Sequence, residues 1–116
     1  MPTVLFVCAH GAYRSRLAAA FFNASPPDGW HAASAGQEPQ EAMSDAAIRL
    51  VAGTAAEPHL ELDRPHAIAD HYAPDRVVAI DCDVPGAERW TLATERIGPA
   101  QRDEIRMRVE RLAREL

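Results

Sequence analysis

A single α/β domain built on a parallel β-sheet is the fold class that the sequence predicts. Residues 3–8 and 76–81 are two continuously apolar runs rich in β-branched residues, as expected of strands buried on both faces of a parallel sheet. Segments with helical periodicity follow both runs, and the clearest of them closes the chain at 98–116. Alternating strands and helices favour parallel strands joined by right-handed crossovers.

The first half of the chain predicts two further helices and one further strand. Residues 14–23 follow the first strand and place Leu17 and Phe21 on one apolar side, which predicts a helix that the next prolines end. Residues 30–36 are expected to form a short second strand. Residues 41–53 repeat the helical pattern and end at a glycine.

The second half is less regular until the last helix. Residues 54–75 carry three prolines and three histidines with no clean period, and a short helix at 65–72 is the one element expected there. After the strand at 76–81, a short fourth strand is expected at 89–92. The final helix has an apolar stripe at i, i+4, i+7 and i+11, formed by Ile105, Val109, Leu112 and Leu116.

Length and composition restrict the class of protein. The chain of 116 residues is enough for one domain, expected to span 1–116, and too short for two. Its formal net charge is −5, which argues against nonspecific binding to nucleic acid or to anionic membranes. No apolar run reaches transmembrane length. Two cysteines cannot build a disulfide scaffold, so a cytoplasmic location is expected.

The stretch from Cys8 to Ser15 carries the chemistry. It lies between a buried strand and a helix, where α/β sheets bind ligands, and the helix N-terminus favours an anion. A tight loop at this point presents backbone N–H groups, Gly11 permits a positive φ, and the fork of Arg14 suits a phosphate-like group. We therefore expect an oxyanion-binding loop formed by Ala9, His10, Gly11, Ala12, Tyr13 and Arg14.

Cys8 is the predicted nucleophile of this loop. The positive end of a helix and a nearby arginine favour the thiolate form of a cysteine, and the hydroxyl of Ser15 can donate a hydrogen bond to that thiolate. The simpler alternative is that Cys8 is a small buried hydrophobe and Arg14 a solvated helix residue. The combination of strand, cysteine, loop, Arg-Ser and helix is much rarer than either part and favours the oxyanion site.

No metal and no cofactor are expected. His59, His66 and His71 lie near Asp63 and Asp70 in the sequence, but their spacing matches no zinc signature. A solvated loop is the simpler interpretation of that cluster.

With these residues identified, the chain resembles the low-molecular-weight protein tyrosine phosphatase superfamily, which includes thiol-linked arsenate reductases. The segment CAHGAYRSRLA at 8–18 is similar to the reductase loop C-x-H-N-A-G-R-S-Q-M-A. The segments SAGQEP at 34–39, RVVAIDCD at 76–83 and the C-terminal helix also resemble the family. The resemblance implies the phosphotyrosine protein phosphatase I fold, a four-stranded parallel sheet of order 2-1-3-4 flanked by helices. It also implies that Cys8 is the nucleophile, Arg14 the oxyanion clamp and Ser15 the thiolate stabiliser.

The chain departs from the family pattern at several positions. Gly11 replaces the loop asparagine, and Tyr13 stands where a small residue or a cysteine is usual. The family supplies a general-acid aspartate from an Asp-Pro turn after the fourth strand, and the matching segment here, RWTLATERIGPAQ at 89–101, has none. Glu95 is the candidate replacement acid. Cys82 lies near the second cysteine of the reductases, although a partly buried thiol is its simpler interpretation.

Three functions remain open from the sequence. Arsenate reduction is favoured, with Cys8 attacking arsenate and an external low-molecular-weight thiol or redoxin completing the cycle. The close alternative is a phosphomonoesterase or protein tyrosine phosphatase that forms a phosphocysteine at Cys8. The third is an oxyanion- or phosphoprotein-binding module without catalysis, because the general-acid aspartate is missing.

Overall fold

Four parallel strands form the central sheet in the computed structural model, which describes residues 1–116. The strands are β1 (Thr3–Cys8), β2 (His31–Gly36), β3 (Arg76–Ile80) and β4 (Glu88–Trp90). Their order is β2-β1-β3-β4, which confirms the predicted topology. Because β1 and β2 pair in parallel with Cys8 opposite Gly36, the carboxyl ends of both strands lie at the same edge of the sheet.

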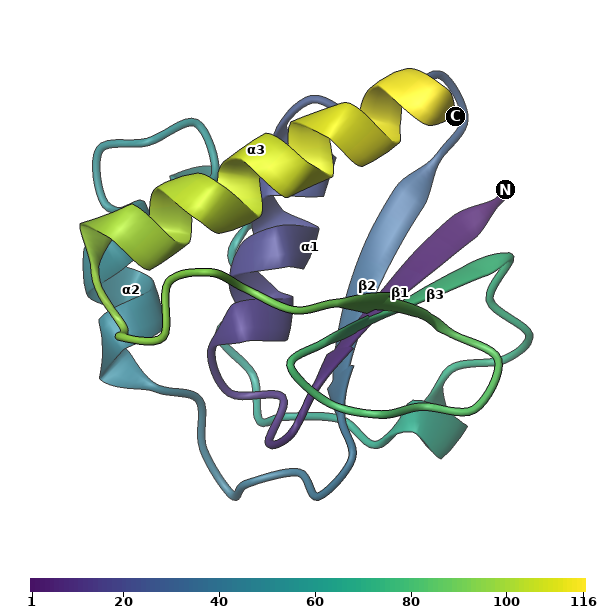
Figure 1. Cartoon of the computed structure of the whole chain (residues 1–116), viewed down its shortest axis with the longest axis horizontal. Coiled ribbons are helices and arrows are strands. Elements are labelled where there is room, and N and C mark those ends of the chain that lie inside the picture. The colour runs from purple at the N-terminus through teal and green to yellow at the C-terminus, as the bar shows by residue number, and fades with distance from the viewer.

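Three helices pack on one face of this sheet. They are α1 (Arg14–Ala24), α2 (Asp45–Val51) and α3 (Pro99–Glu115). Figure 1 shows α3, in yellow-green, crossing α1, and the two helices are in contact. The predicted stripe of α3 faces inward, since Ile105, Val109 and Leu112 are buried. They join a core that includes Phe6 of β1, whose ring centre lies 5.7 Å from that of Trp90.

The opposite face of the sheet is covered by a smaller core. Strand residues alternate between the two faces, so Val4 and Phe6 belong to the helical core whereas Leu5 and Val7 belong to the second one. Ile68 packs against this second core from the short 3-10 helix Ile68–Asp70; another such helix, Glu57–His59, precedes it in the chain. β1 and the end of β3 are thus buried on both faces, as their apolar sequences predict.

Two predicted helices are shorter than their sequence patterns. The helix expected at 41–53 begins only at Asp45, because Ser44 has extended backbone angles and its side chain accepts a hydrogen bond from the N–H of Ala46 as a helix cap. The helix expected at 65–72 is reduced to the single 3-10 turn. The side chain of Tyr72 in this region is 99% exposed. None of the helices combines the length and the apolar character needed to cross a bilayer.

Candidate active site

The loop between β1 and α1 is held by hydrogen bonds to its carbonyl groups. The carbonyl oxygens of Cys8, Ala9 and His10 accept hydrogen bonds from the backbone N–H groups of Gln37, Glu38 and Gln40, at 3.0, 2.8 and 3.1 Å respectively. The carbonyl of Ala12 accepts one from the N–H of Ser44 at 2.9 Å. The segment 37–44, which follows β2, therefore lines one side of the loop, and Figure 1 shows both at the lower edge of the sheet.

This arrangement determines where the N–H groups of the loop point. All peptide bonds of the chain are trans, so the N–H of each residue points away from the carbonyl of the residue before it. With the carbonyls of the loop directed toward segment 37–44, the N–H groups that follow them point to the opposite side. None of the N–H groups of residues 9–15 donates to an acceptor within the protein. A set of free N–H groups on one side of a loop is the arrangement expected of an anion-binding cradle, and we call this set the cradle.

Gly11 allows the loop to lie close to the end of β2. Its φ is +65°, in the left-handed region, and a Cβ atom built on it would lie only 2.7 Å from the backbone nitrogen of Gly36. A Cβ on Gly36 would in turn lie 2.4 Å from the carbonyl carbon of His10. The two glycines therefore pack backbone against backbone, which no pair of larger residues could reproduce.

The predicted nucleophile lies at the base of the cradle. The Sγ of Cys8 is 3.1 Å from the Oγ of Ser15, and both side chains are buried, with Cys8 4% and Ser15 0% exposed. When Cys8 is a thiolate, the Ser15 hydroxyl can donate this hydrogen bond to it. The structure thus places the predicted nucleophile and its predicted stabiliser in contact.

Arg14 begins α1 and is held from β3. Its Nε lies 3.4 Å from Oδ2 of Asp81, the residue directly after β3. The other carboxylate oxygen of Asp81 accepts a hydrogen bond from the N–H of Leu92 at 2.9 Å. Asp81 therefore attracts the guanidinium at its Nε edge by charge, although Nε itself donates no hydrogen bond, and the two terminal nitrogens are left for a ligand. No signal in the sequence assigns this carboxylate to Arg14.

A cavity of about 180 Å³ opens over the loop. It is lined by Cys8, by every residue of the loop except Gly11, and by three residues from later segments: Gln40, Ser44 and Ile97. His10 also lines it, is exposed, and has its Nδ1 3.4 Å from the carbonyl of Glu38. Neither Glu95 nor Cys82, the two other candidate residues, is among the lining residues.

The turn after β4 contains the position of the family's general acid. The N–H groups of Ala93 and Thr94 both donate to the carboxylate of Glu104 at 2.8 Å, and the side chain of Gln101 donates to the carbonyl of Thr94 at 2.7 Å. Burial by itself would raise the pKa of Glu104, but these hydrogen bonds and that from Arg108 lower it. The turn is therefore tied to α3, and Glu95 is exposed beside it.

Cys82 belongs to the core on the opposite face of the sheet. Its thiol is 8% exposed and donates to the carbonyl of Val7 at 3.6 Å. Burial raises the pKa of Cys82, and the charge of Cys8 adds to that effect. Neither cysteine is in a disulfide. The environment of Cys82 therefore favours a neutral thiol.

Tyr13 packs in the helical core rather than in solvent. It is 5% exposed, and its hydroxyl is one of three buried side-chain polar atoms without a hydrogen-bond partner. Burial raises the pKa of Tyr13, and the backbone of Gly98 with the charges of Arg14 and Arg102 only partly opposes this. The phenol stays neutral at physiological pH.

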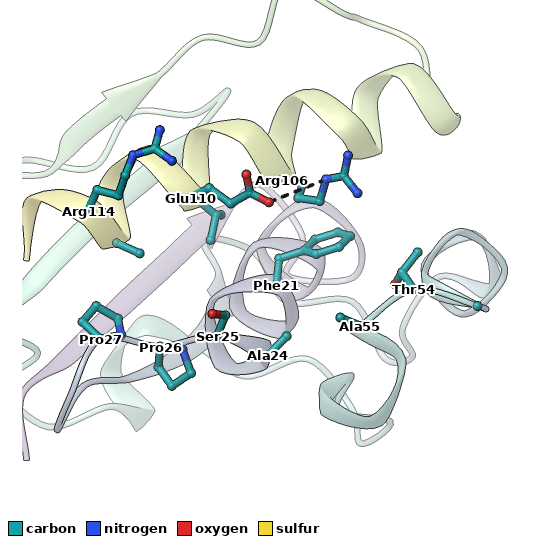
Figure 2. Close-up of a pocket in the computed structure, with 13 residues that line it drawn as sticks. Phe21, Ala24, Ser25, Pro26, Pro27, Thr54, Ala55, Arg106, Glu110 and Arg114 are labelled. Carbon is teal, nitrogen blue, oxygen red and sulfur yellow. Dashed lines mark ion pairs between the residues drawn. The ribbon is translucent and has the colours of Figure 1, made fainter.

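The largest cavity of the molecule lies elsewhere. It measures about 640 Å³ and runs between α3 and the end of α1, where Figure 2 shows Phe21 and the ion pair of Arg106 with Glu110. None of the predicted site residues lines it. Size alone would favour this cavity, whereas the predicted cysteine and arginine, together with the free N–H groups, favour the smaller cavity over the loop.

Comparison with known proteins places this chain in a family. No family model matches the chain, and no curated protein matches it in sequence. Among solved structures, an arsenate reductase from Archaeoglobus fulgidus is 30% identical, with a TM-score of 0.76 over 95% of this chain and 98% of that one. A low-molecular-weight protein tyrosine phosphatase from T. tengcongensis is 19% identical, with a TM-score of 0.73 over 100% of both chains.

An arginine phosphatase from Geobacillus stearothermophilus has a TM-score of 0.70 and is 21% identical, over 99% of this chain and 92% of that one. The two phosphatases share the fold, and the reductase shares sequence over nearly its whole length as well. The chain belongs to the low-molecular-weight protein tyrosine phosphatase superfamily.

Proposed function

We propose that this protein is a cysteine-nucleophile oxyanion enzyme that reduces arsenate. The observation that carries the proposal is the cradle. The loop carbonyls accept hydrogen bonds on one side, and the free N–H groups lie on the other side, next to Cys8 and Arg14. Preorganised N–H groups and a guanidinium stabilise negative charge as it develops on a tetrahedral oxyanion. The similarity to the Archaeoglobus fulgidus arsenate reductase supports the choice of arsenate.

The first step is attack of the Cys8 thiolate on arsenate. The Sγ–As bond forms while one As–O bond breaks, and the departing oxygen leaves as water after accepting a proton. Arg14 and the loop N–H groups hold the remaining arsenate oxygens, and the hydroxyl of Ser15 stabilises the thiolate before attack. The oxidation state of arsenic does not change in this step.

An external thiol completes the cycle. Its thiolate attacks the sulfur of Cys8, an S–S bond forms, and the electron pair of the breaking S–As bond stays on arsenic. Arsenic is thereby reduced from As(V) to As(III) and leaves as arsenite. A second thiol equivalent then reduces the mixed disulfide and restores Cys8. A low-molecular-weight thiol or a redoxin fits this role, and the chemistry requires a reducing compartment such as the cytoplasm.

The absence of a carboxylate from the cavity lining favours arsenate over a phosphate ester. The alkoxide or phenoxide that leaves a phosphate monoester needs a proton donor, and loss of such a donor typically costs ~10²–10⁴-fold in rate. The residues that line the cavity over Cys8 include no Asp or Glu. Protonated arsenate carries hydroxyl groups of its own and depends less on a protein acid.

A phosphomonoesterase is the alternative function. The same cradle accepts phosphate, and Cys8 would form a phosphocysteine that water then hydrolyses. In this case Glu95 would have to protonate the leaving group. It is exposed next to Thr94, whose N–H is hydrogen-bonded to Glu104 of α3. If neither reaction occurs, the protein is an oxyanion- or phosphoprotein-binding module.

Alkylation by iodoacetamide tests the shared part of these functions. Each cysteine would be followed by mass spectrometry between pH 5 and 9, with and without phosphate or arsenate. We expect Cys8 to react below neutral pH and to be protected by either oxyanion. Cys82 is the internal control, because its raised pKa keeps it a neutral and slowly reacting thiol.

Turnover then separates the functions. We expect arsenite to form from arsenate and a low-molecular-weight thiol, and the Cys8→Ser variant to form none. Hydrolysis of an aryl phosphate with a good leaving group, without arsenite formation, would favour the phosphatase. Protection of Cys8 without any turnover would favour the binding module, and no protection would overturn the oxyanion site itself.

A further inference from the structure

Arg16 is a buried charge in an otherwise apolar stretch of α1. It is 2% exposed, and the residues that follow it, from Leu17 to Phe22, are all buried and apolar. A buried guanidinium is costly unless its donors are satisfied, so its partners identify what it does. Sequence reasoning assigned it no role.

One end of this guanidinium contacts the oxyanion loop. Its Nε donates to the carbonyl of Gly11 at 3.1 Å. The other carbonyls from Cys8 to Tyr13 accept backbone N–H groups, four from segment 37–44 and one from Leu17. Gly11 is therefore the one residue of that stretch whose carbonyl depends on a side chain.

The other end of the guanidinium contacts the irregular segment 54–75. Its Nη1 donates to the carbonyl of Glu61 at 2.6 Å and lies 3.5 Å from Oδ1 of Asp63. Asp63 also pairs with His66. Burial alone would raise the pKa of Asp63, but His66 and the charge of Arg16 lower it, so Asp63 is ionised at neutral pH.

The bond to Gly11 has a direct consequence for the cradle. The carbonyl of Gly11 and the N–H of Ala12 belong to one trans peptide and point in opposite directions. A donor that holds the carbonyl on the side of Arg16 thus turns the N–H of Ala12 to the other side, and Ala12 lines the cavity over Cys8. Gly36 lies against this part of the loop and excludes a sideways shift.

We propose that Arg16 is a positioning residue for oxyanion binding, which aims the N–H of Ala12 by holding the carbonyl of Gly11. This inference rests on the proposed function of the loop as an oxyanion site. The alternative is that Arg16 only fastens segment 54–75 to α1. The two roles belong to different nitrogens of one side chain, Nε and Nη1, and can be separated.

Three substitutions separate them because side-chain length determines which donor is kept. In Arg16→Gln, the amide nitrogen occupies the same bond position as Nε, so the bond to Gly11 is kept and the contacts with Glu61 and Asp63 are lost. In Arg16→Lys, the ammonium lies one bond beyond the position of Nε and one bond short of that of Nη1. We expect the carboxylate of Asp63 and the carbonyl of Glu61 to hold it, so that the bond to Gly11 is lost. Arg16→Met loses both.

The measurement is protection of Cys8 from iodoacetamide as a function of inorganic phosphate concentration, alongside the thermal midpoint of each variant. In Arg16→Gln, we expect the phosphate concentration that protects Cys8 to stay within about twofold of that for the unsubstituted protein. In Arg16→Lys and Arg16→Met, we expect that concentration to rise by roughly 10- to 100-fold. The thermal midpoint should follow the opposite order, with Arg16→Lys above Arg16→Gln. Arg111→Gln is the matched control, because Arg111 is exposed on α3 and makes no hydrogen bond or ion pair.

Equal protection in the Gln and Lys variants, or better protection in the Lys variant, would overturn the positioning role. If Arg16→Met does not fold, the Gln and Lys pair still decides, because each keeps one set of contacts. Failure of phosphate to protect Cys8 in the unsubstituted protein would instead overturn the oxyanion site, so the two failures are distinguishable.

Discussion

The Nε of Arg14 and the Oδ2 of Asp81 lie 3.4 Å apart and join the first residue of α1 to the end of β3. Asp81 has a φ of +53°, and its other oxygen accepts the N–H of Leu92, so the carboxylate is held in turn by the chain after β4. The side chains of Arg14 and Asp81 are 28% and 29% exposed. Nε of Arg14 donates no hydrogen bond, so the charge of Asp81 alone biases the orientation of the planar fork that bidentate binding of an oxyanion needs.

Arg14→Lys should weaken oxyanion binding with little loss of stability. A lysine keeps the positive charge but cannot pair with Asp81 and present two donors to an oxyanion at the same time. Loss of one or two charged hydrogen bonds should raise the phosphate concentration that protects Cys8 by roughly 10- to 100-fold. The control is Arg89→Lys, because Arg89 pairs with Asp83 outside the cavity. If phosphate protects Cys8 equally well in Arg14→Lys and in the unsubstituted protein, a positive charge at this position is sufficient for oxyanion binding.

Tyr13→Phe should leave phosphate protection unchanged and should not destabilise the protein. The hydroxyl of Tyr13 is buried without a hydrogen-bond partner, so its removal relieves an unsatisfied group and should raise the free energy of unfolding by up to about 1 kcal/mol. Urea denaturation measures this. Tyr72→Phe is the control, because its ring is 99% exposed and should change nothing. Loss of protection in Tyr13→Phe would instead assign the hydroxyl to the ligand.

Gly11→Ala should cost more than a left-handed backbone alone explains. Gly86 has a φ of +79° and open space around it, so Gly86→Ala should cost about 1–2 kcal/mol of stability from backbone strain only. Gly11 has a similar φ, but its Cβ would also clash with Gly36, which brings the expected cost to roughly 2–4 kcal/mol. Urea denaturation compares the two. Equal costs would mean that the loop moves away from β2 without penalty.

Glu104→Gln should destabilise the protein near neutral pH and much less in acid. The carboxylate is 17% exposed and accepts hydrogen bonds from Ala93 and Thr94, so we expect a loss of about 1–3 kcal/mol at pH 7. Because the pKa of Glu104 is lowered in the folded state, its contribution is present above the unfolded value of 4.5 and is lost as the pH falls through the folded value.

The difference in unfolding free energy between the two proteins should therefore be constant above about pH 5.5 and should shrink below 4.5. Urea denaturation at pH 7 and pH 4 measures it. Glu115→Gln is the control, since Glu115 is exposed and forms no ion pair. A difference that stays the same at both pH values would show that the charge of Glu104 does not hold the turn.

The sequence by itself determined the elements whose identity depends on local pattern. The apolar run of β1 and the stripe of α3 each match an element of the structure, because strand and helix periodicities are properties of neighbouring residues. The same holds for Cys8 and Ser15, which are seven residues apart and meet because one turn joins β1 to α1. The length of α2 was overestimated, since the capping bond of Ser44 begins the helix later than the apolar pattern does.

Only the tertiary structure decided which distant groups complete the site. The donors that hold the loop carbonyls come from segment 37–44, the anchor of Arg14 comes from Asp81, and the partners of Arg16 come from the irregular segment 54–75. Each of these contacts joins residues at least 25 positions apart, or falls where the sequence has no period. Periodicity reports how a segment lies against its own core, and carries no information on which remote hydrogen-bonding group reaches it.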